Sequence, residues 1–91
     1  MDLAVIASIL SSNEDLPINS KICFSGEVGL NGEIRPVPRI ENHIHEAERI
    51  GFKTIVISSY NQIILKDFKI KIIECSKVNE LHSLLSSLSN L

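Results

Sequence analysis

The chain has 91 residues, of which 44% are hydrophobic and 4% aromatic, and its net charge is −2. This length fits one small domain with a single core, and the composition predicts a core of aliphatic side chains. The near-neutral charge argues against a domain that grips DNA over its whole surface, because such domains carry a clear basic excess. A local basic patch is compatible with it.

The two cysteines, Cys23 and Cys75, lie far apart within apolar runs and form no C-x-x-C pair. We expect buried free thiols, because disulfides belong mainly to secreted proteins and no signal peptide is recognisable. No run reaches the roughly 18 apolar residues of a membrane span. The expectation is therefore a cytoplasmic protein with no membrane partner.

The first predicted element is a helix at residues 2–12, where apolar side chains recur at helical spacing. Asp2 is placed to cap its first turn. Because this helix starts almost at the first residue, we expect a domain that is truncated at its N-terminus. Residues 13–19 then form a loop.

A β-hairpin is predicted next. Residues 21–30 are a strand, and Asn31-Gly32 is a strong signal for a two-residue turn in which both residues take positive φ. Residues 33–37 are the returning strand. Two prolines at 36 and 38 lack an N–H donor, so this strand should end there or lie at an edge.

A second helix is predicted at residues 40–50, and Gly51 should end it in the left-handed conformation. The apolar positions of this helix share one face: Ile40, Ile44, Ala47 and Ile50. Residues 54–57 are a β-branched run, which is typical of a strand buried on both faces.

The last part of the chain continues the alternation of strand and helix. Residues 61–67 are a loop, 69–75 a strand in which Ile70 and Ile72 share one face, and 77–88 a helix capped by Ser76. This order predicts an α/β (α+β) fold, with helices packed on a sheet, in a single domain spanning residues 1–91.

The glycines of the hairpin do not form a phosphate-binding loop. Gly26, Gly29 and Gly32 recur every three residues and precede a strand, whereas G-x-G-x-x-G opens a helix. With Asn31, they are interpreted as a structural turn and a bulged strand.

Catalytic and metal-binding patterns are lacking in the sequence. His43 and His45 point to different sides of one helix, and His82 is isolated, so we expect no metal site. There is no G-x-S-x-G, S-x-x-K or Walker A motif, and we expect neither an enzymatic activity nor a cofactor in this chain.

Arg35 and Arg39 flank the prolines, and Lys53 follows the second predicted helix. A guanidinium group suits phosphate and carboxylate equally well. Two interpretations therefore stay open: solvated side chains with local ion pairs to Glu33 or Glu41, and a contact to phosphate or to another subunit.

Two segments resemble the RadA (Sms) family of bacterial DNA repair proteins. Residues 26–37 read Gly-Glu-Val-Gly-Leu-Asn-Gly-Glu-Ile-Arg-Pro-Val, similar to the family's G-E-V-G-L-x-G-E-I-R-P-V. Residues 46–53 resemble its E-A-x-x-x-G-F-K. Residues 2–5 and 76–85 resemble helices that lie before and after these segments.

The resemblance implies a Lon-protease-like domain of the type seen in the second domain of ribosomal protein S5, lacking its first β elements. In the family this C-terminal domain is a scaffold for a hexameric ring and contributes to DNA binding. The parent would be a RecA-like, DNA-stimulated ATPase acting in branch migration beside a RecA-type recombinase. Its ATP and Mg²⁺ site and its zinc finger would lie upstream.

Lon itself cleaves peptides with a Ser–Lys dyad. The resemblance places Glu41 at the position of the lysine, and the serine before Asp2, outside this chain. A carboxylate is anionic near neutral pH and cannot lower the proton affinity of a serine. We therefore expect a degenerate, non-catalytic domain. Loss of the first β elements would also leave an unpaired sheet edge.

Two alternatives remain. One is the Lon-like domain of a ComM-type (magnesium-chelatase-like) AAA+ ATPase, whose G-E-L-x-L-x-G-x-x-R-P-V segment is similar. Val28 and Glu33-Ile34 favour RadA over it. The other is a fragment of an active Lon-type peptidase, which Glu41 disfavours.

Overall fold

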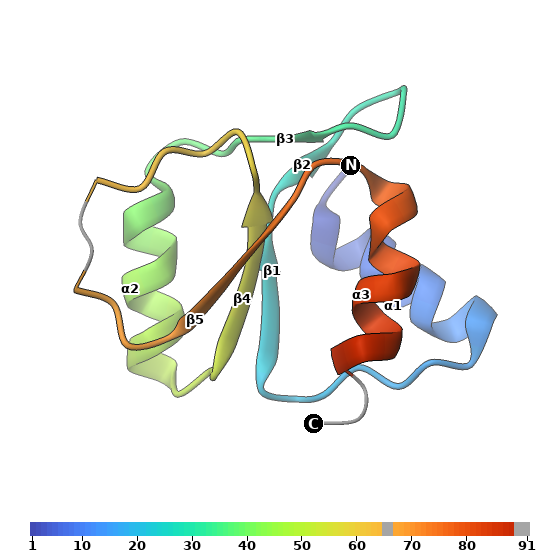
Figure 1. Ribbon diagram of the computed structural model, residues 1–91, viewed down its shortest axis with the longest axis horizontal. Coiled ribbons are helices and arrows are strands. Elements are labelled where there is room, and N and C mark those ends of the chain that lie inside the picture. The colour runs from blue at the N-terminus through green and yellow to red at the C-terminus, as the bar shows by residue number, and fades with distance from the viewer. Residues whose placement is uncertain (65–66, 89–91) are drawn as a thin grey trace.

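The computed structural model describes residues 1–64 and 67–88, and its centre is a three-stranded parallel sheet (Figure 1). The strand order is β1 (Ile22–Ser25), β4 (Thr54–Ser58), β5 (Lys71–Cys75). All five residues of the middle strand β4 are buried, as expected for a β-branched run with a neighbour on each side. The predicted α/β class is confirmed.

Helices cover both faces of this sheet, with α2 (Ile40–Ile50) on one side and α1 (Leu3–Glu14) and α3 (Leu81–Leu88) on the other (Figure 1). Each side has its own core. The core under α2 is built from these buried residues: Ile40, Ile44, Ala47, Ile55, Ile57 and Ile70. The core under α1 and α3 is built from these: Leu3, Ile22, Ile34, Val56, Cys75, Leu81 and Leu88.

The ends of α1 and α2 follow simple capping rules. The Asp2 carboxylate accepts the Ala4 N–H at 2.7 Å, as predicted. Gly51 ends α2 with φ 112°, and the Phe52 N–H donates to the Ala47 carbonyl at 3.0 Å. The bounds of α2 match the prediction, but Ile50, which was assigned to the apolar face, is 60% exposed.

The strand predicted at residues 21–30 is two strands. It breaks at Gly26, and β2 (Glu27–Val28) leaves the parallel sheet to pair antiparallel with β3 (Ile34–Arg35). The break is tightly packed, since a Cβ on Gly26 would lie 3.1 Å from side-chain carbons of both Ile34 and Leu3. The absence of a side chain at Gly26 therefore allows the chain to change sheets.

The turn of this hairpin differs from the predicted one. Gly32 has φ 79°, but Asn31 does not have positive φ. The Gly32 N–H donates to the Gly29 carbonyl at 3.1 Å, and the Gly29 N–H donates to the Glu33 carbonyl at 2.9 Å. These bonds close a three-residue loop with one left-handed glycine, in place of a two-residue turn with two left-handed residues.

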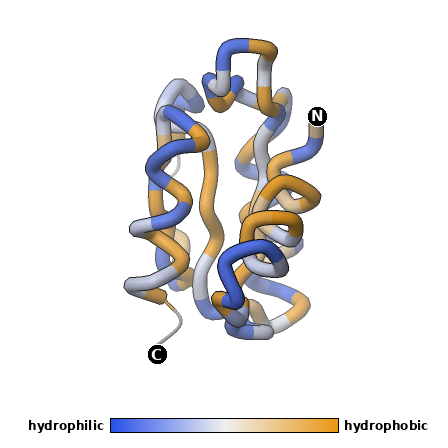
Figure 2. The backbone as a smooth tube through the Cα atoms, turned by 90° about the vertical axis from the view of Figure 1, so that its right-hand side faces the viewer, coloured by the Kyte–Doolittle hydropathy of each residue, from blue (hydrophilic) through white to orange (hydrophobic). Residues whose placement is uncertain are grey.

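The hairpin is held on its β2 side by the start of the chain. Asp2 bridges antiparallel to Glu27, and the Leu3 N–H donates to the Gly26 carbonyl at 3.0 Å. Viewed from the side, the hairpin stands above α1 and α3, with the N-terminus next to it (Figure 2). The first half of α1 is hydrophobic in the same view, and its end is hydrophilic.

On its β3 side the hairpin is held by the segment that leaves β5. The Ile34 N–H donates to the Ser76 carbonyl and the Val78 N–H to the Gly32 carbonyl, both at 2.8 Å. The buried Ser58 hydroxyl adds a bond to the Ile34 carbonyl at 2.8 Å. The hairpin is thus tied to the central strand and to the chain before the last helix.

The cap of the last helix was predicted incorrectly. A short 3₁₀ helix, η1 (Val78–Glu80), precedes α3, and the Glu80 carboxylate accepts the Lys77 N–H at 2.9 Å. The Ser76 hydroxyl instead lies 2.6 Å from the Ser59 hydroxyl. Glu80 therefore performs the capping that the sequence analysis assigned to Ser76.

The segment between β4 and β5 has no helix or strand at residues 61–64 and 67–70. Residues 65 and 66 of the predicted loop lie outside the described residues. The strand predicted from residue 69 starts at Lys71, and its facing is confirmed: Ile70 and Ile72 pack towards α2, and Ile73 packs towards α1 and α3. No helix within the described ranges is long and apolar enough to cross a membrane.

The turn geometry yields a stability prediction. Gly32→Ala forces an L side chain into the left-handed region and should lower the free energy of unfolding by about 1 kcal/mol. Asn31→Ala should cost less than about 0.5 kcal/mol, because this residue has no positive φ to support. Urea denaturation of both variants is the measurement. Equal losses at the two positions would contradict the three-residue loop.

Candidate functional site

Arg35, one of the predicted phosphate contacts, is engaged within the hairpin. Its Nε and Nη2 donate to the Glu33 Oε2 at 3.3 and 3.0 Å. The other oxygen of Glu33 accepts the Asn31 N–H at 3.1 Å. A Cβ on Gly29 would lie 2.4 Å from this carboxyl group, so the glycine leaves the space that Glu33 occupies.

The pKa of Glu33 lies below its ordinary value of 4.5. The largest cause is a hydrogen bond from its own backbone, followed by the hydrogen bond from Arg35. Both favour the charged carboxylate. Of the two interpretations of Arg35, the local ion pair with Glu33 is what the structure shows.

Arg39 and Lys53 lie at opposite ends of α2. Arg39 is exposed, precedes the first turn, and has φ 57° without capping the helix through its side chain. Lys53 is exposed and follows Gly51, so the 11 residues of α2 separate the two by about 16 Å along its axis. The structure therefore does not gather Arg35, Arg39 and Lys53 into one site.

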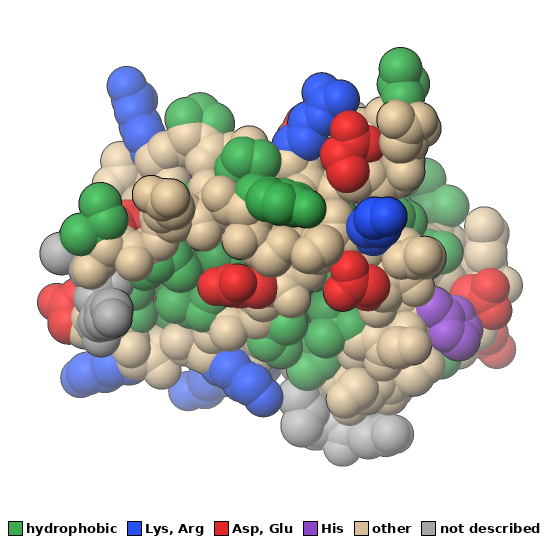
Figure 3. All heavy atoms as spheres, turned by 45° about the horizontal axis from the view of Figure 1, so that its top comes forward, with side chains coloured by type: hydrophobic (Ala, Val, Ile, Leu, Met, Phe, Trp, Pro, Cys, Tyr) green, Lys and Arg blue, Asp and Glu red, His purple; other side chains and the backbone are tan. Residues whose placement is uncertain are grey.

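Lys53 has other basic neighbours instead. Its N–H donates to the Lys21 carbonyl at 2.9 Å, and the Lys71 N–H donates to the Lys53 carbonyl at 3.0 Å. We call Lys21, Lys53, Lys69 and Lys71 the amino-edge lysines, because they lie where the three parallel strands begin. All four are exposed. In Figure 3, Lys and Arg side chains gather at the lower left of the molecule.

The amino-edge lysines were missed by the sequence analysis, although a signal exists. Each of them lies at, or within two residues of, the start of a strand. Because parallel strands begin at the same edge of a sheet, basic residues at these positions must lie together. Of these four lysines, only Lys53 was predicted as a phosphate contact, and it was grouped with Arg35 and Arg39.

Glu41, at the expected position of the Lon lysine, has a structural contact. Its Oε2 accepts the Ile64 N–H and so ties the first turn of α2 to the segment after β4. Asn61 adds a second tie, since its side chain donates to the Val37 carbonyl at 2.9 Å and accepts the Val37 N–H at 3.3 Å. A cavity of about 330 Å³ lies beside these contacts.

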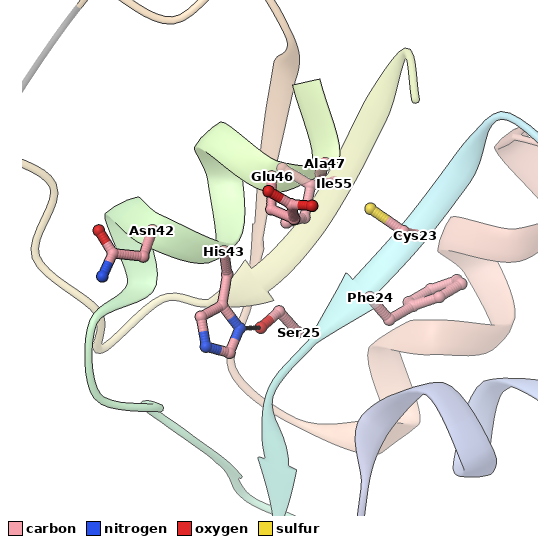
Figure 4. A pocket seen from close by; sticks show the side chains of 8 residues that line it. All are labelled: Cys23, Phe24, Ser25, Asn42, His43, Glu46, Ala47 and Ile55. Carbon is pink, nitrogen blue, oxygen red and sulfur yellow. Dashed lines mark hydrogen bonds between the residues drawn. The ribbon is translucent and has the colours of Figure 1, made fainter. Parts of the chain in front are cut away.

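A larger open cavity of about 490 Å³ lies between β1 and α2 (Figure 4). At its mouth the Ser25 Oγ is 2.7 Å from the His43 Nδ1. The two residues are 18 positions apart in the chain, and no sequence pattern predicts their contact. Cys23, Glu46 and Ile55 also line this cavity.

The Ser25–His43 pair has the spacing of a nucleophile and a base, but its surroundings do not complete a catalytic site. The nearby Glu46 carboxylate accepts Arg49 Nε at 3.1 Å, and the hydrogen bond from Arg49 lowers the Glu46 pKa. In the described part of the chain, Ser25 is the hydrogen-bonded partner of His43, so no carboxylate orients the ring. Burial raises the pKa of the Cys23 thiol, which keeps it protonated at neutral pH.

Metal binding gains no support from the geometry. Within residues 1–64 and 67–88, no three His, Cys, Asp or Glu side chains are grouped so that they could hold an ion. Cys23 and Cys75 are both free, and they face opposite cores of the sheet. The predicted burial holds for Cys75, whereas Cys23 is only half-buried.

These features define a small α/β domain with a helix-covered parallel sheet, a tied β-hairpin and exposed basic residues. The family model for subunit ChlI of Mg-chelatase matches residues 1–61, and the chain belongs to this family.

Several relatives of this chain carry the name DNA repair protein RadA. The protein of Bacillus subtilis is 51% identical over 61 residues, which are 67% of this chain and 13% of the relative. Those of Listeria monocytogenes and Streptococcus pneumoniae are 52% and 53% identical over 62 and 57 residues, covering 68% and 63% of this chain. The chain spans about 14% of these two relatives, and the resemblance to RadA is confirmed.

The low pKa of Glu33 makes part of the stability depend on pH. Its folded-state pKa is below the ordinary 4.5, so its contribution is present above that pH and is lost as the pH falls through the folded-state pKa. Glu33→Gln should therefore flatten the decline in the free energy of unfolding below about pH 4.5. Denaturant titrations at several pH values measure this. Identical acid profiles for both proteins would contradict the assignment.

Proposed function

We propose that this chain is a non-catalytic scaffold and DNA-contact domain, with a Lon-like fold, of a RadA-type DNA repair protein. The observation that carries the proposal is the identity of about one half to relatives named RadA over some 60 residues. The α/β architecture with a parallel sheet is consistent with a Lon-like domain.

The non-catalytic role is supported by what Glu41 does. Its carboxylate is used to accept a backbone N–H from the segment after β4, and an anionic group cannot act as the lysine of a Ser–Lys dyad. The Ser25–His43 pair adds no alternative centre, because Arg49 binds the neighbouring carboxylate of Glu46. A Lon-type peptidase is therefore the less favoured function.

The DNA-contact role is supported by exposed basic residues on a chain of net charge −2. Arg39 and Lys53 are exposed and form no ion pair within the described residues, whereas Arg35 is paired with Glu33. Arg35, Arg39 and Lys53 remain the proposed phosphate contacts. The separation of Lys53 from the arginines means that DNA would not touch all three at one point.

The parent protein would supply the remaining activities. We propose a RecA-like, DNA-dependent ATPase acting in recombination and branch migration in the cytoplasm, with its ATP and Mg²⁺ site and a zinc finger outside this chain. The domain would help to assemble a hexameric ring that works with a RecA-type recombinase. Because the chain spans about one seventh of its relatives, each of these is a property proposed for the whole protein.

The alternative is a ComM-type AAA+ ATPase, and the family model favours it in one respect, since it is named for a Mg-chelatase subunit. The relatives favour RadA. The neighbouring sequence of the parent decides between them: a RecA-type Walker A motif before this domain supports RadA, and an AAA+ module after it supports the alternative.

DNA binding by the 91-residue chain tests the proposal. A fluorescent DNA duplex should bind with an affinity that falls as salt rises from about 50 to 200 mM. Replacing Arg35, Arg39 and Lys53 together by Ala should weaken binding. The slope of log affinity against log salt concentration should become shallower by at least about 0.9, the contribution of one phosphate contact. Absence of binding by the wild-type chain, or an unchanged slope in the variant, would sink the DNA-contact role.

Substitution of Glu41 tests the non-catalytic role. Glu41→Lys restores a lysine but removes the acceptor for the Ile64 N–H, so it should cost about 1 kcal/mol of stability and produce no peptidase activity. Glu41→Gln keeps an acceptor oxygen and is the matched control, expected to lose less stability. Cleavage of an unfolded protein substrate by wild type, abolished in either variant, would revive the peptidase function.

A further inference from the structure

Ion pairing divides the basic residues of the chain into two groups. Within residues 1–64 and 67–88, Arg35 is paired with Glu33, and Arg49 with Glu46. The amino-edge lysines Lys21, Lys53, Lys69 and Lys71 form no ion pair in the same ranges, which is also true of Arg39 and Lys77, and no hydrogen bond among the described residues engages the ammonium groups of the four lysines. Their charges are therefore available to a ligand.

The parallel sheet fixes the spacing of these lysines. Lys21, Lys53 and Lys71 lie at the beginnings of the adjacent strands β1, β4 and β5, which are joined there by hydrogen bonds of 2.9 and 3.0 Å. Neighbouring strands are about 4.8 Å apart, so the three backbones span about 10 Å along one edge. Figure 1 shows the three strands starting from the same side of the molecule.

The acidic groups at this edge do not cancel the lysines. Glu48 Oε2 accepts the Lys69 N–H at 2.7 Å and the Ile70 N–H at 3.3 Å, so this carboxylate is directed at the backbone. Asp67 is exposed two residues before Lys69. The four lysines outnumber these two carboxylates, and the edge carries a net positive charge while the whole chain is negative.

We propose that the amino-edge lysines form the principal phosphate-contact surface of this domain, along which the backbone of DNA runs across the starts of the three parallel strands. The proposal rests on the DNA-contact role proposed above, and it assigns the main contact to these lysines in place of the two arginines. Lys53 belongs to this surface, whereas Arg39 lies at the opposite end of α2 and Arg35 lies in the hairpin strand β3. Lysines on flexible stems contact phosphates as point charges, which gives affinity without reading sequence.

The salt dependence of DNA binding measures the number of contacts. Four lysine–phosphate contacts on a duplex predict a log–log slope near −3.6, so affinity should fall about 100-fold between roughly 50 and 200 mM salt. Each of Lys21→Gln, Lys69→Gln and Lys71→Gln in the 91-residue chain should make the slope shallower by about 0.9. Lys77→Gln removes the same charge outside this edge and should leave the slope unchanged.

Two double variants then locate the surface. Lys21→Gln/Lys71→Gln and Arg35→Gln/Arg39→Gln change the net charge equally, and the lysine pair should weaken binding at low salt by at least about tenfold, clearly more than the arginine pair. Lys21→Arg/Lys71→Arg should retain wild-type binding because the charges stay. Thermal unfolding verifies that every variant is folded.

The possible results separate the two proposals. If wild type does not bind DNA, the DNA-contact role itself is wrong. If wild type binds but the arginine pair or Lys77→Gln costs as much as the lysine pair, binding follows net charge or the arginine end, and the amino-edge surface is overturned. A loss specific to the lysine variants, with a shallower salt slope, supports the surface.

Discussion

The burial of β4 is the constraint on which the rest of the molecule depends. A strand with all five residues buried must pair its backbone on both sides and cover both faces with apolar groups. The neighbours β1 and β5 satisfy the first requirement, and α2 on one face with α1 and α3 on the other satisfy the second. Because all three strands are parallel, each connection must return the chain from the carboxyl ends of the strands to their amino ends. All three strands therefore begin at the same edge.

The hairpin is a second unit that is held on the sheet by hydrogen bonds and by the buried Ile34 side chain. Gly26 lets the chain pass from β1 into β2, and Ser58 bonds β4 to the Ile34 carbonyl. The segments at residues 1–3 and 76–78 hold the two sides of the hairpin. The Gly-Glu-Val-Gly segment, which identified the family in the sequence, therefore has a clear structural role, and this role explains its glycines without any ligand.

Sequence patterns predicted the elements that depend on local chemistry and long apolar runs. The bounds of α2, the buried strand at residues 54–57, and the facing of Ile70 and Ile72 were correct, since periodicity and a terminal glycine determine them. The errors have both distant and local causes. The break at Gly26 depends on packing against Ile34, and the Ser76 hydroxyl contacts Ser59, whereas the Glu80 cap and the three-residue turn are formed by near neighbours in the sequence.

The same distinction applies to the candidate sites. The local ion pair of Arg35 with Glu33 could be expected two residues apart in a strand, where side chains share a face. The Ser25–His43 contact could not be expected from the sequence. It joins the end of β1 to α2, and these two elements are brought together only by the fold. The amino-edge lysines are an intermediate case. Each lysine could be recognised near the start of a predicted strand, but their proximity follows only if the strands are known to be parallel.

The position of the amino-edge lysines would determine how the domain approaches a polyanion. A chain of net charge −2 with four unpaired lysines at one edge would be repelled by DNA in most orientations and attracted where this edge faces it. Encounters would then select a single pose before any close contact forms. In a ring of identical subunits, the symmetry would repeat this edge once in every domain, so its charge would be multiplied around the ring.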